Sequence, residues 1–173
     1  RRFVHRALGW NCRMTNMQAA IGCAQLESIR ANLVRKREVG QLYSKLLAGV
    51  PGLLLPPHEL GGEGNIYWVY GVMVDSACCF DAEAVTKALS ARKVGTRPFF
   101  WCMHEQPVLK EMGLIPEGTS CPVAENMARR GFYLPSGLAL TNEQVEHVAS
   151  ERSLLQACNH PSLLRMPGAL PAA

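Results

Sequence analysis

The sequence predicts an α/β fold in which a small layer of strands and helices follows a helical arm. Three observations support this prediction. The first 49 residues are rich in helix formers and carry an apolar stripe. Residues 50–151 alternate between short β-branched or aromatic runs and segments with helix caps. After residue 151, prolines and a glycine interrupt any helix, so residues 152–173 are expected to form a disordered or non-native tail.

The helical arm is predicted to begin near Thr15. Thr15 and Gln18 have the spacing of a capping box, in which each side chain satisfies a backbone amide at the helix start. The pattern predicts two successive helical segments, the second running from Ser28 towards Leu47. Gly49 and the residues after it are expected to end the arm.

The strongest strand candidate covers residues 66–74. It is β-branched and aromatic and apolar on both faces, so we expect it to be buried, with Tyr67, Trp68 and Tyr70 in the core. Asp81 is expected to cap the helix that follows. The remaining predicted elements are strands at 52–56, 94–100 and 132–135, a flexible loop at 61–64, and helices at 81–92, 105–113, 122–130 and 141–150.

Composition narrows the function classes. The formal net charge is +4, and the two basic clusters at 35–37 and 129–130 indicate solvated helix faces rather than a nucleic-acid surface. No stretch is long and apolar enough to predict a membrane span. The seven cysteines are irregularly spaced without a C-x-x-C motif, which favours reduced thiols and a cytoplasmic location. Cys102 and His104 lack a second ligand pair, so no metal site is predicted.

Three segments, in this order, resemble the DegT/DnrJ-type (StrS-like) sugar aminotransferases. They are LGWNCRMTNMQAAIGCAQLE at 8–27, GTRPFFWCMHEQPVL at 95–109 and CPVAENMARRGFYLPSGLALTNEQV at 121–145. Within that family, YWVYGV together with TRPFF is most similar to perosamine-synthase-like members, which aminate a GDP-linked 4-keto-6-deoxy sugar. The resemblance extends from residue 8 to about residue 150.

The resemblance implies a fold-type-I transferase that depends on pyridoxal 5'-phosphate. This chain would be its C-terminal part: residues 1–49 would be the end of the large domain with linking helices, and residues 50–151 the small α/β domain. It further implies a homodimer with active sites between subunits, a nucleotide-sugar substrate and an amino-acid donor. Neither a nucleic-acid partner nor a membrane is expected.

The resemblance also suggests five site residues. Asn11 would reach the cofactor phosphate of the partner subunit, and Arg13 would lie near the amino donor or the sugar nucleotide. Arg97, Phe100 and His104 would line the sugar-nucleotide pocket. Without the resemblance, the same residues have ordinary roles: Asn11 and Arg13 in a loop before a helix, Arg97 in a surface ion pair, and His104 as a cap of the next helix.

The reactive centre is not expected within this chain. Amine transfer through pyridoxal phosphate needs a lysine that bonds to the cofactor and a carboxylate for its ring nitrogen. None of the lysines (36, 45, 87, 93 and 110) has the small-residue, strand-flanked context of the family's lysine, so no catalytic residue is predicted and the chain alone would be inactive. The expected parent activity is amino transfer from an amino acid, such as glutamate, to a nucleotide-linked 4-keto-6-deoxy sugar. Alternatives are a pyridoxal-phosphate-dependent sugar dehydratase of the same family, and a non-catalytic remnant or dimerisation module.

Overall fold

The structure is a computed structural model that describes residue 10 and residues 12–151. The expected tail at 152–173 therefore lies outside the described residues. The elements are, in order, α1 (Asn16–Leu46), β1 (Leu53–Leu54), β2 (Glu59–Leu60), β3 (Glu63–Gly64), β4 (Tyr70–Val74), α2 (Ala82–Ala91), β5 (Arg97–Pro98), the 3-10 helix η1 (Met103–Glu105), α3 (Pro107–Glu111), α4 (Pro122–Arg130), β6 (Gly131–Leu134) and α5 (Asn142–Ser150).

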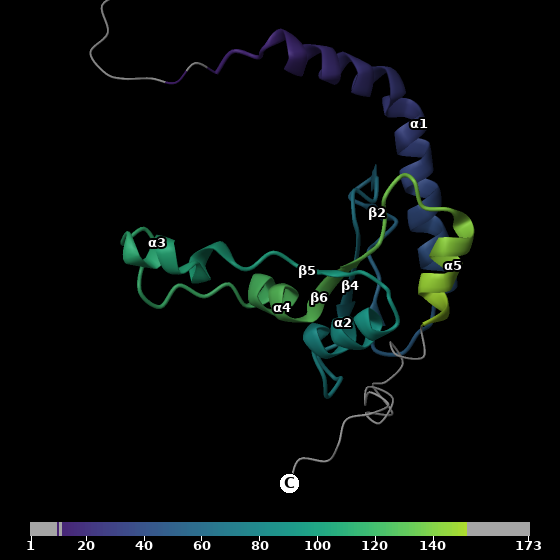
Figure 1. The fold of residues 1–173 in the computed structure, drawn as a ribbon. Helices are drawn as coiled ribbons and strands as arrows, with labels where there is room; N and C mark the ends of the chain where they lie inside the picture. The colour runs from purple at the N-terminus through teal and green to yellow at the C-terminus, as the bar shows by residue number, and fades with distance from the viewer. Residues whose placement is uncertain (1–9, 11, 152–173) are drawn as a thin grey trace, which may run out of the picture.

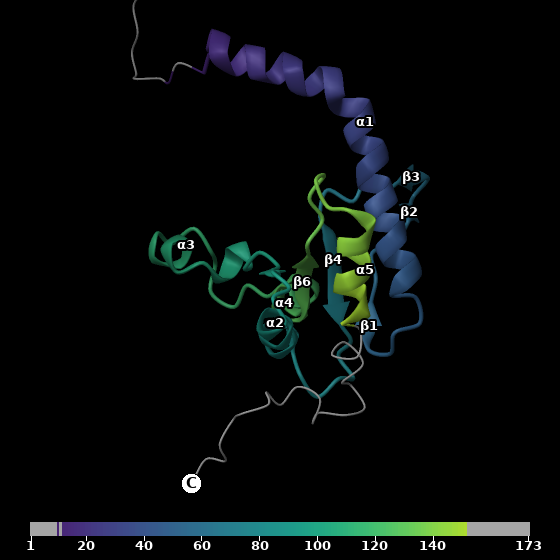
Figure 2. The same cartoon turned by 45° about the vertical axis from the view of Figure 1, so that its right-hand side comes forward.

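Helix α1 is one continuous helix of 31 residues, so the prediction of two helical segments is wrong. No proline interrupts it, and most of its residues are good helix formers. The capping box is confirmed, because Thr15 accepts from the Gln18 amide while the Gln18 side chain accepts from the Thr15 amide. The first half of α1 stands clear of the body, whereas its second half lies beside α5 (Figures 1 and 2).

The centre of the body is a four-stranded antiparallel sheet with strand order β1-β4-β6-β5. Register pairs Val72 with Phe132, and both are fully buried on one face of the sheet. On the opposite face, Tyr133 is paired with Gly71 on one side and with Arg97 on the other. Strand β6 thus has one fully buried face and an opposite face on which Tyr133 is half-buried.

The core joins the end of α1 to the sheet. The rings of Tyr43 on α1 and Tyr70 on β4 stack with centroids 4.8 Å apart. Burial raises the pKa of Tyr70 to about 12, with an opposing contribution from its hydrogen bond to Ser44. Val85 on α2 and Val145 on α5 are also fully buried. The helical caps at Asp81 and Thr141 are confirmed, and each orients a helix that covers the sheet.

The strand predicted at 66–74 begins only at Tyr70. Tyr67 has a φ of 49°, in the left-handed region that non-glycine residues adopt rarely, and a bend at residues 68–69 precedes the strand. Tyr67 and Tyr70 are buried as expected, but Trp68 is 67% exposed, so its placement in the core is wrong. The loop expected at 61–64 is the turn and second strand of a short hairpin, formed by β2 and β3.

The basic clusters are not simply solvated helix faces. Arg35 donates to the Leu140 carbonyl (2.5 Å) and the Asn142 side chain (3.0 Å). The Arg130 guanidinium donates to several backbone carbonyls at the end of β4 and after it, including those of Val74 and Phe80, both at 3.0 Å. The solvated-face interpretation is therefore wrong for these residues, because their guanidinium groups are bonded to backbone carbonyls of other segments.

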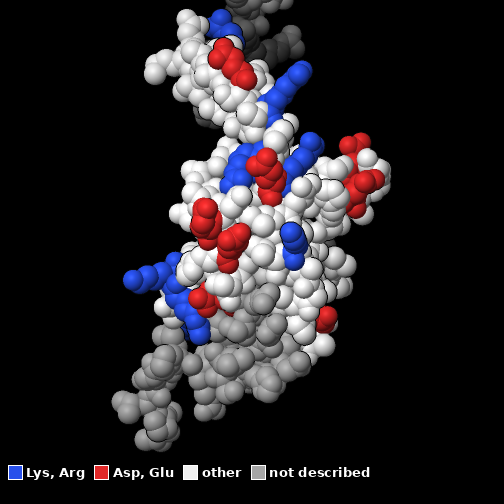
Figure 3. Space-filling view, turned by 90° about the vertical axis from the view of Figure 1, so that its right-hand side faces the viewer, with Lys and Arg blue, Asp and Glu red and all other residues white. Residues whose placement is uncertain are grey.

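On the face that presents α1 and α5, basic and acidic side chains are intermingled (Figure 3). Within the part of the chain that is described, no helix has both the length and the apolar character needed to cross a bilayer. Cys78 is disulfide-bonded, contrary to the expectation of reduced thiols. The free cysteines among the described residues are Cys12, Cys23, Cys79, Cys102 and Cys121.

Candidate functional site

The predicted site residues fall into separate parts of the structure. Asn11 lies outside the described residues. Arg13 is exposed, just before α1, beside Met14 and Gln18. Lys36 of α1 lines the same cavity as Arg97, and the helix before it rises about 30 Å from Asn16. Because this part of α1 projects away from the sheet (Figure 1), the described chain does not bring Arg13 to Arg97.

Arg97 lines a cavity of about 560 Å³ at the end of the sheet. The cavity lies between α1, the chain before β4, the start of β5 and the chain after β6, and Trp68 and Tyr133 contribute its aromatic lining. Arg97 is exposed, and no ion pair involves it among the described residues. The surface ion pair considered for Arg97 is therefore not found among the described residues.

Lys36 forms the α1 side of the same cavity. Its ammonium donates to the carbonyls of Trp68 (2.8 Å) and Ser136 (2.6 Å), so one lysine ties α1 to the chain before β4 and to the chain after β6. Burial lowers the pKa of Lys36. The cavity lining contains no aspartate or glutamate, which leaves its two cationic side chains without a neutralising carboxylate in the wall.

Phe100 does not line the cavity that Arg97 lines. It is 74% exposed and meets the Tyr133 ring edge-on, with centroids 6.2 Å apart. It lines a second cavity of about 710 Å³ between α2 and the chain after β5, together with Phe99, Trp101 and Arg129. Arg97 and Phe100 thus open on two different cavities that share the aromatic column around Tyr133.

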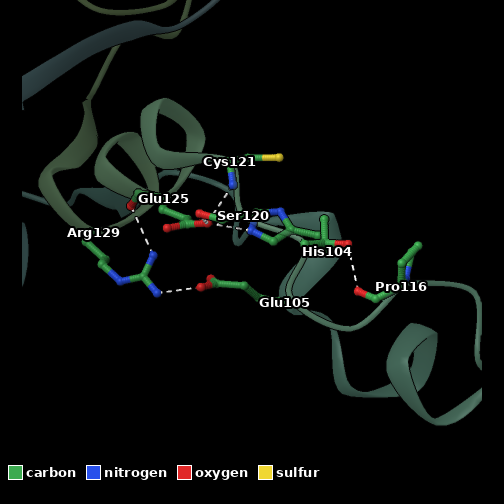
Figure 4. A network of polar contacts seen from close by, with 8 residues as sticks. His104, Glu105, Pro116, Ser120, Cys121, Glu125 and Arg129 are labelled. Atoms are coloured by element: carbon green, nitrogen blue, oxygen red, sulfur yellow. Dashed lines mark hydrogen bonds and ion pairs between the residues drawn. The ribbon is translucent and has the colours of Figure 1, made fainter.

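His104 is held in a polar network at the start of α4 (Figure 4). Its Nε2 lies 2.9 Å from Oε1 of Glu125, and the same oxygen accepts from the Cys121 amide at 2.7 Å and the Ser120 hydroxyl at 3.1 Å. The amide of Cys121, followed by His104, lowers the pKa of the Glu125 carboxyl. His104 is therefore bonded to Glu125 rather than capping α3, whose N-cap Gln106 makes no side-chain cap.

A second ion pair runs parallel to the first. Arg129 donates to Oε1 of Glu105 at 2.6 Å, and its guanidinium lies 5.1 Å from the Trp101 ring centroid. Because Glu125 and Arg129 are one helical turn apart on α4, the two pairs hold the segment from Trp101 to Glu105 against one face of that helix. This network fixes the segment that carries Phe100 and His104.

His104, Glu105 and Glu125 are the one group of described residues whose side chains could hold a metal, with ligand atoms within 4.8 Å of one another. Oε2 of Glu105 is buried without a hydrogen-bond partner. However, the guanidinium of Arg129 already occupies the other oxygen of Glu105, and it would repel a bound cation. The arrangement is that of a salt-bridge network.

The small antiparallel sheet with its covering helices is an α/β fold that is also found in solved structures. The Spr1654 protein of Streptococcus pneumoniae, solved in its PLP-form, shares this fold with a TM-score of 0.77 at 18% identity, over 88% of this chain and 38% of that chain. The chain belongs to the DegT/DnrJ/EryC1/StrS aminotransferase family, whose model matches residues 1–152. Membership of this aminotransferase family indicates pyridoxal phosphate dependence.

Two relatives are GDP-perosamine synthases. The protein from Vibrio cholerae is 30% identical over 150 residues, which cover 87% of this chain and 40% of the relative. The protein from Escherichia coli O157:H7 is 33% identical over 148 residues, which cover 86% of this chain and 38% of the relative. The chain thus spans about two fifths of the length of these curated relatives.

The described residues do not by themselves fit pyridoxal phosphate. Lys36 is half-buried, but its ammonium is bonded to two carbonyls and no carboxylate lines its cavity to hold a pyridinium nitrogen. The other lysines are exposed. The described residues therefore offer no lysine and carboxylate that are placed together to hold this cofactor.

Sequence reasoning missed Lys36, Trp68, Glu125 and Arg129. The four-residue spacing of Glu125 and Arg129 on a predicted helix was a usable signal, because it places both side chains on one face. Lys36 and Trp68 gave no such signal. The carbonyls that bind Lys36 belong to Trp68 and Ser136, which are 32 and 100 residues away along the chain. Only the tertiary fold brings these groups together.

Proposed function

We propose that this chain is the C-terminal portion of a pyridoxal-phosphate-dependent aminotransferase. The enzyme would move an amino group from an amino acid, such as glutamate, to the keto carbon of a nucleotide-linked 4-keto-6-deoxy sugar. The observation that carries the proposal is the family match over residues 1–152, supported by two relatives named GDP-perosamine synthase. Because the chain spans about two fifths of those relatives, other residues would complete the reactive centre.

In this proposal the chain supplies binding groups. Arg97, with an open guanidinium, and the exposed ring of Phe100 contact the sugar nucleotide from the small domain. His104 contributes from a position fixed by Glu125. Arg13 lies near the amino donor or the sugar nucleotide, and Asn11 serves the cofactor phosphate of a partner subunit.

The first half of α1 supports the proposed division into domains. Met17, Ile21 and Leu26 are each more than 60% exposed on this half of the helix. Leaving apolar surface in water costs about 25 cal/mol per Å², and large exposed apolar patches mark interaction surfaces. Residues 1–49 would then pack on a large domain, residues 50–151 would form the small domain, and the enzyme would be a homodimer with shared sites.

The test is an assay of the enzyme that carries this chain as its C-terminal portion. A GDP-linked 4-keto-6-deoxy sugar is incubated with ¹⁵N-glutamate and pyridoxal phosphate, and the products are identified by mass spectrometry. A ¹⁵N-labelled 4-amino sugar supports aminotransfer. A deoxygenated keto sugar without label would instead identify the dehydratase of the same family. The absence of both products, with the cofactor bound, would favour the non-catalytic remnant or dimerisation module.

A further inference from the structure

We infer that Phe99 is a positioning residue for the nucleotide-sugar substrate, because its ring fixes the segment that carries Arg97 and Phe100 to the sheet. This inference rests on the proposed function, in which Arg97 and Phe100 contact the sugar nucleotide. It adds a residue that the resemblance does not assign. Three features carry it: the short edge strand, the fit of the ring, and the place of the ring between two cavities.

The first feature is the short backbone pairing of the segment that carries both side chains. Strand β5 consists of Arg97 and Pro98, lies at the edge of the sheet and has β6 as its partner among the described strands. Pro98 has no amide hydrogen to donate. Beyond the strand, the Phe99 amide donates to the Gly131 carbonyl at 3.1 Å. Because the pairing is so short, side-chain contacts contribute much of the anchoring of this segment.

The second feature is a notch in the sheet that fits the Phe99 ring. A Cβ atom added to Gly131 would lie 2.3 Å and 2.6 Å from two carbons of this ring, and one added to Gly71 would lie 3.0 Å and 3.1 Å from two others. Neither glycine has a positive φ, so the backbone conformation does not require glycine at either position. The ring also stacks on Tyr133, with centroids 4.6 Å apart. Glycines on β4 and β6 thus leave the space in which the ring lies.

The third feature is the place of the ring between the two cavities. Tyr133 lines the cavity of about 560 Å³ together with Arg97, whereas Phe99 lines the cavity of about 710 Å³ together with Phe100. The stacked pair of Phe99 and Tyr133 is therefore part of the wall between them. Because Arg97 and Phe100 are close neighbours of Phe99 in the chain, a displaced ring would shift both side chains relative to the sheet.

The experiment is equilibrium dialysis of a labelled GDP-linked 4-keto-6-deoxy sugar against the enzyme that carries this chain as its C-terminal portion. Phe99→Ala should raise the Kd by about ten- to a hundredfold, the size of effect that a misplacement of about 1 Å produces. Gly71→Val should act similarly, because its side chain enters the space of the ring. Gly71 is preferred to Gly131, where a Cβ would also meet the Met127 carbonyl at 2.6 Å. Both changes together should cost no more than Phe99→Ala alone, because valine then enters an empty notch.

Phe80→Ala is the matched control. Phe80 is also half-buried, packs against the core and lines neither cavity, so its loss should lower stability in urea without raising the Kd. In steady-state kinetics, Phe99→Ala should raise the KM of the sugar nucleotide, while kcat and the KM of glutamate change little. A loss of folded enzyme alone would instead lower kcat and leave both KM values unchanged.

An unchanged Kd in Phe99→Ala and Gly71→Val, an equal rise in Phe80→Ala, or the absence of saturable binding by the parent enzyme would overturn the inference. Failure of the proposed function has a different signature, because dialysis does not depend on which product forms. Raised Kd values without a ¹⁵N-labelled amino sugar would remove only aminotransfer. Amino transfer with an unchanged Kd in both variants would remove only the role of Phe99.

Discussion

Replacement of Gly40 by alanine should destabilise the protein, although alanine is the better helix former. Gly40 lies within α1 and is buried against Tyr67. A Cβ added at Gly40 would lie 2.2 Å, 2.4 Å and 2.6 Å from three carbons of the Tyr67 ring. Real atoms do not approach so closely, so either the helix or the ring must move.

The magnitude follows from what holds the ring in place. Tyr67 is 2% exposed, its hydroxyl lies 3.2 Å from Nδ1 of His58, and its ring stacks on Tyr70 at 5.9 Å. Displacing the ring forfeits about 1.5–3 kcal/mol of burial and about 0.5–1.5 kcal/mol of stacking. The gain in helix propensity offsets about 1 kcal/mol of this loss. We therefore expect a net loss of about 1–3 kcal/mol in the free energy of unfolding.

The assay is urea unfolding followed by circular dichroism, with Gly22→Ala as the matched control. Gly22 lies on the same helix, and an added Cβ there meets no atom within 4 Å, so alanine should stabilise by up to about 1 kcal/mol. Combining Gly40→Ala with Tyr67→Ser should cost less than the sum of the two single changes, because they share one contact. A Gly40→Ala chain as stable as the parent, or additive effects in the double variant, would refute the reasoning.

Three further predictions concern the proposed enzyme and its loop network. Asn11→Ala should weaken cofactor binding by about one to two orders of magnitude, and mixing it with subunits that lack the cofactor lysine should restore activity if Asn11 serves the partner subunit. Borohydride reduction of the chain with pyridoxal phosphate should label no single lysine stoichiometrically, as peptide mapping would show; complete labelling of Lys36 would contradict this. The pKa of Glu125 is lowered from its usual 4.5, so its stabilising effect is present above pH 4.5 and is lost as the pH falls through the lowered value. Trp101 fluorescence should therefore change on acidification, and Glu125→Gln should abolish that transition.

Local sequence determines the caps and most helices of this protein. The Thr15 and Thr141 capping boxes and the Asp81 cap were predictable because each depends on residues three apart in the chain. The proline at the start of α4 was equally informative. Family membership also followed from sequence, because three segments in order carry more information than any one of them.

The tertiary structure alone decided the surroundings of the proposed site residues. The pattern at 66–74 was apolar throughout, so periodicity could not show that Tyr67 would adopt a left-handed conformation and that Trp68 would be exposed. Nor could sequence explain a glycine within α1, where propensity disfavours it; the close approach of Tyr67 to Gly40 does. The sequence alone suggests that Lys36 is a surface cation. In the structure, the carbonyl of Ser136, 100 residues away, accepts a hydrogen bond from its ammonium. Local hydrogen bonds are encoded within a few residues, whereas packing and charge pairing across the chain depend on where the fold places each partner.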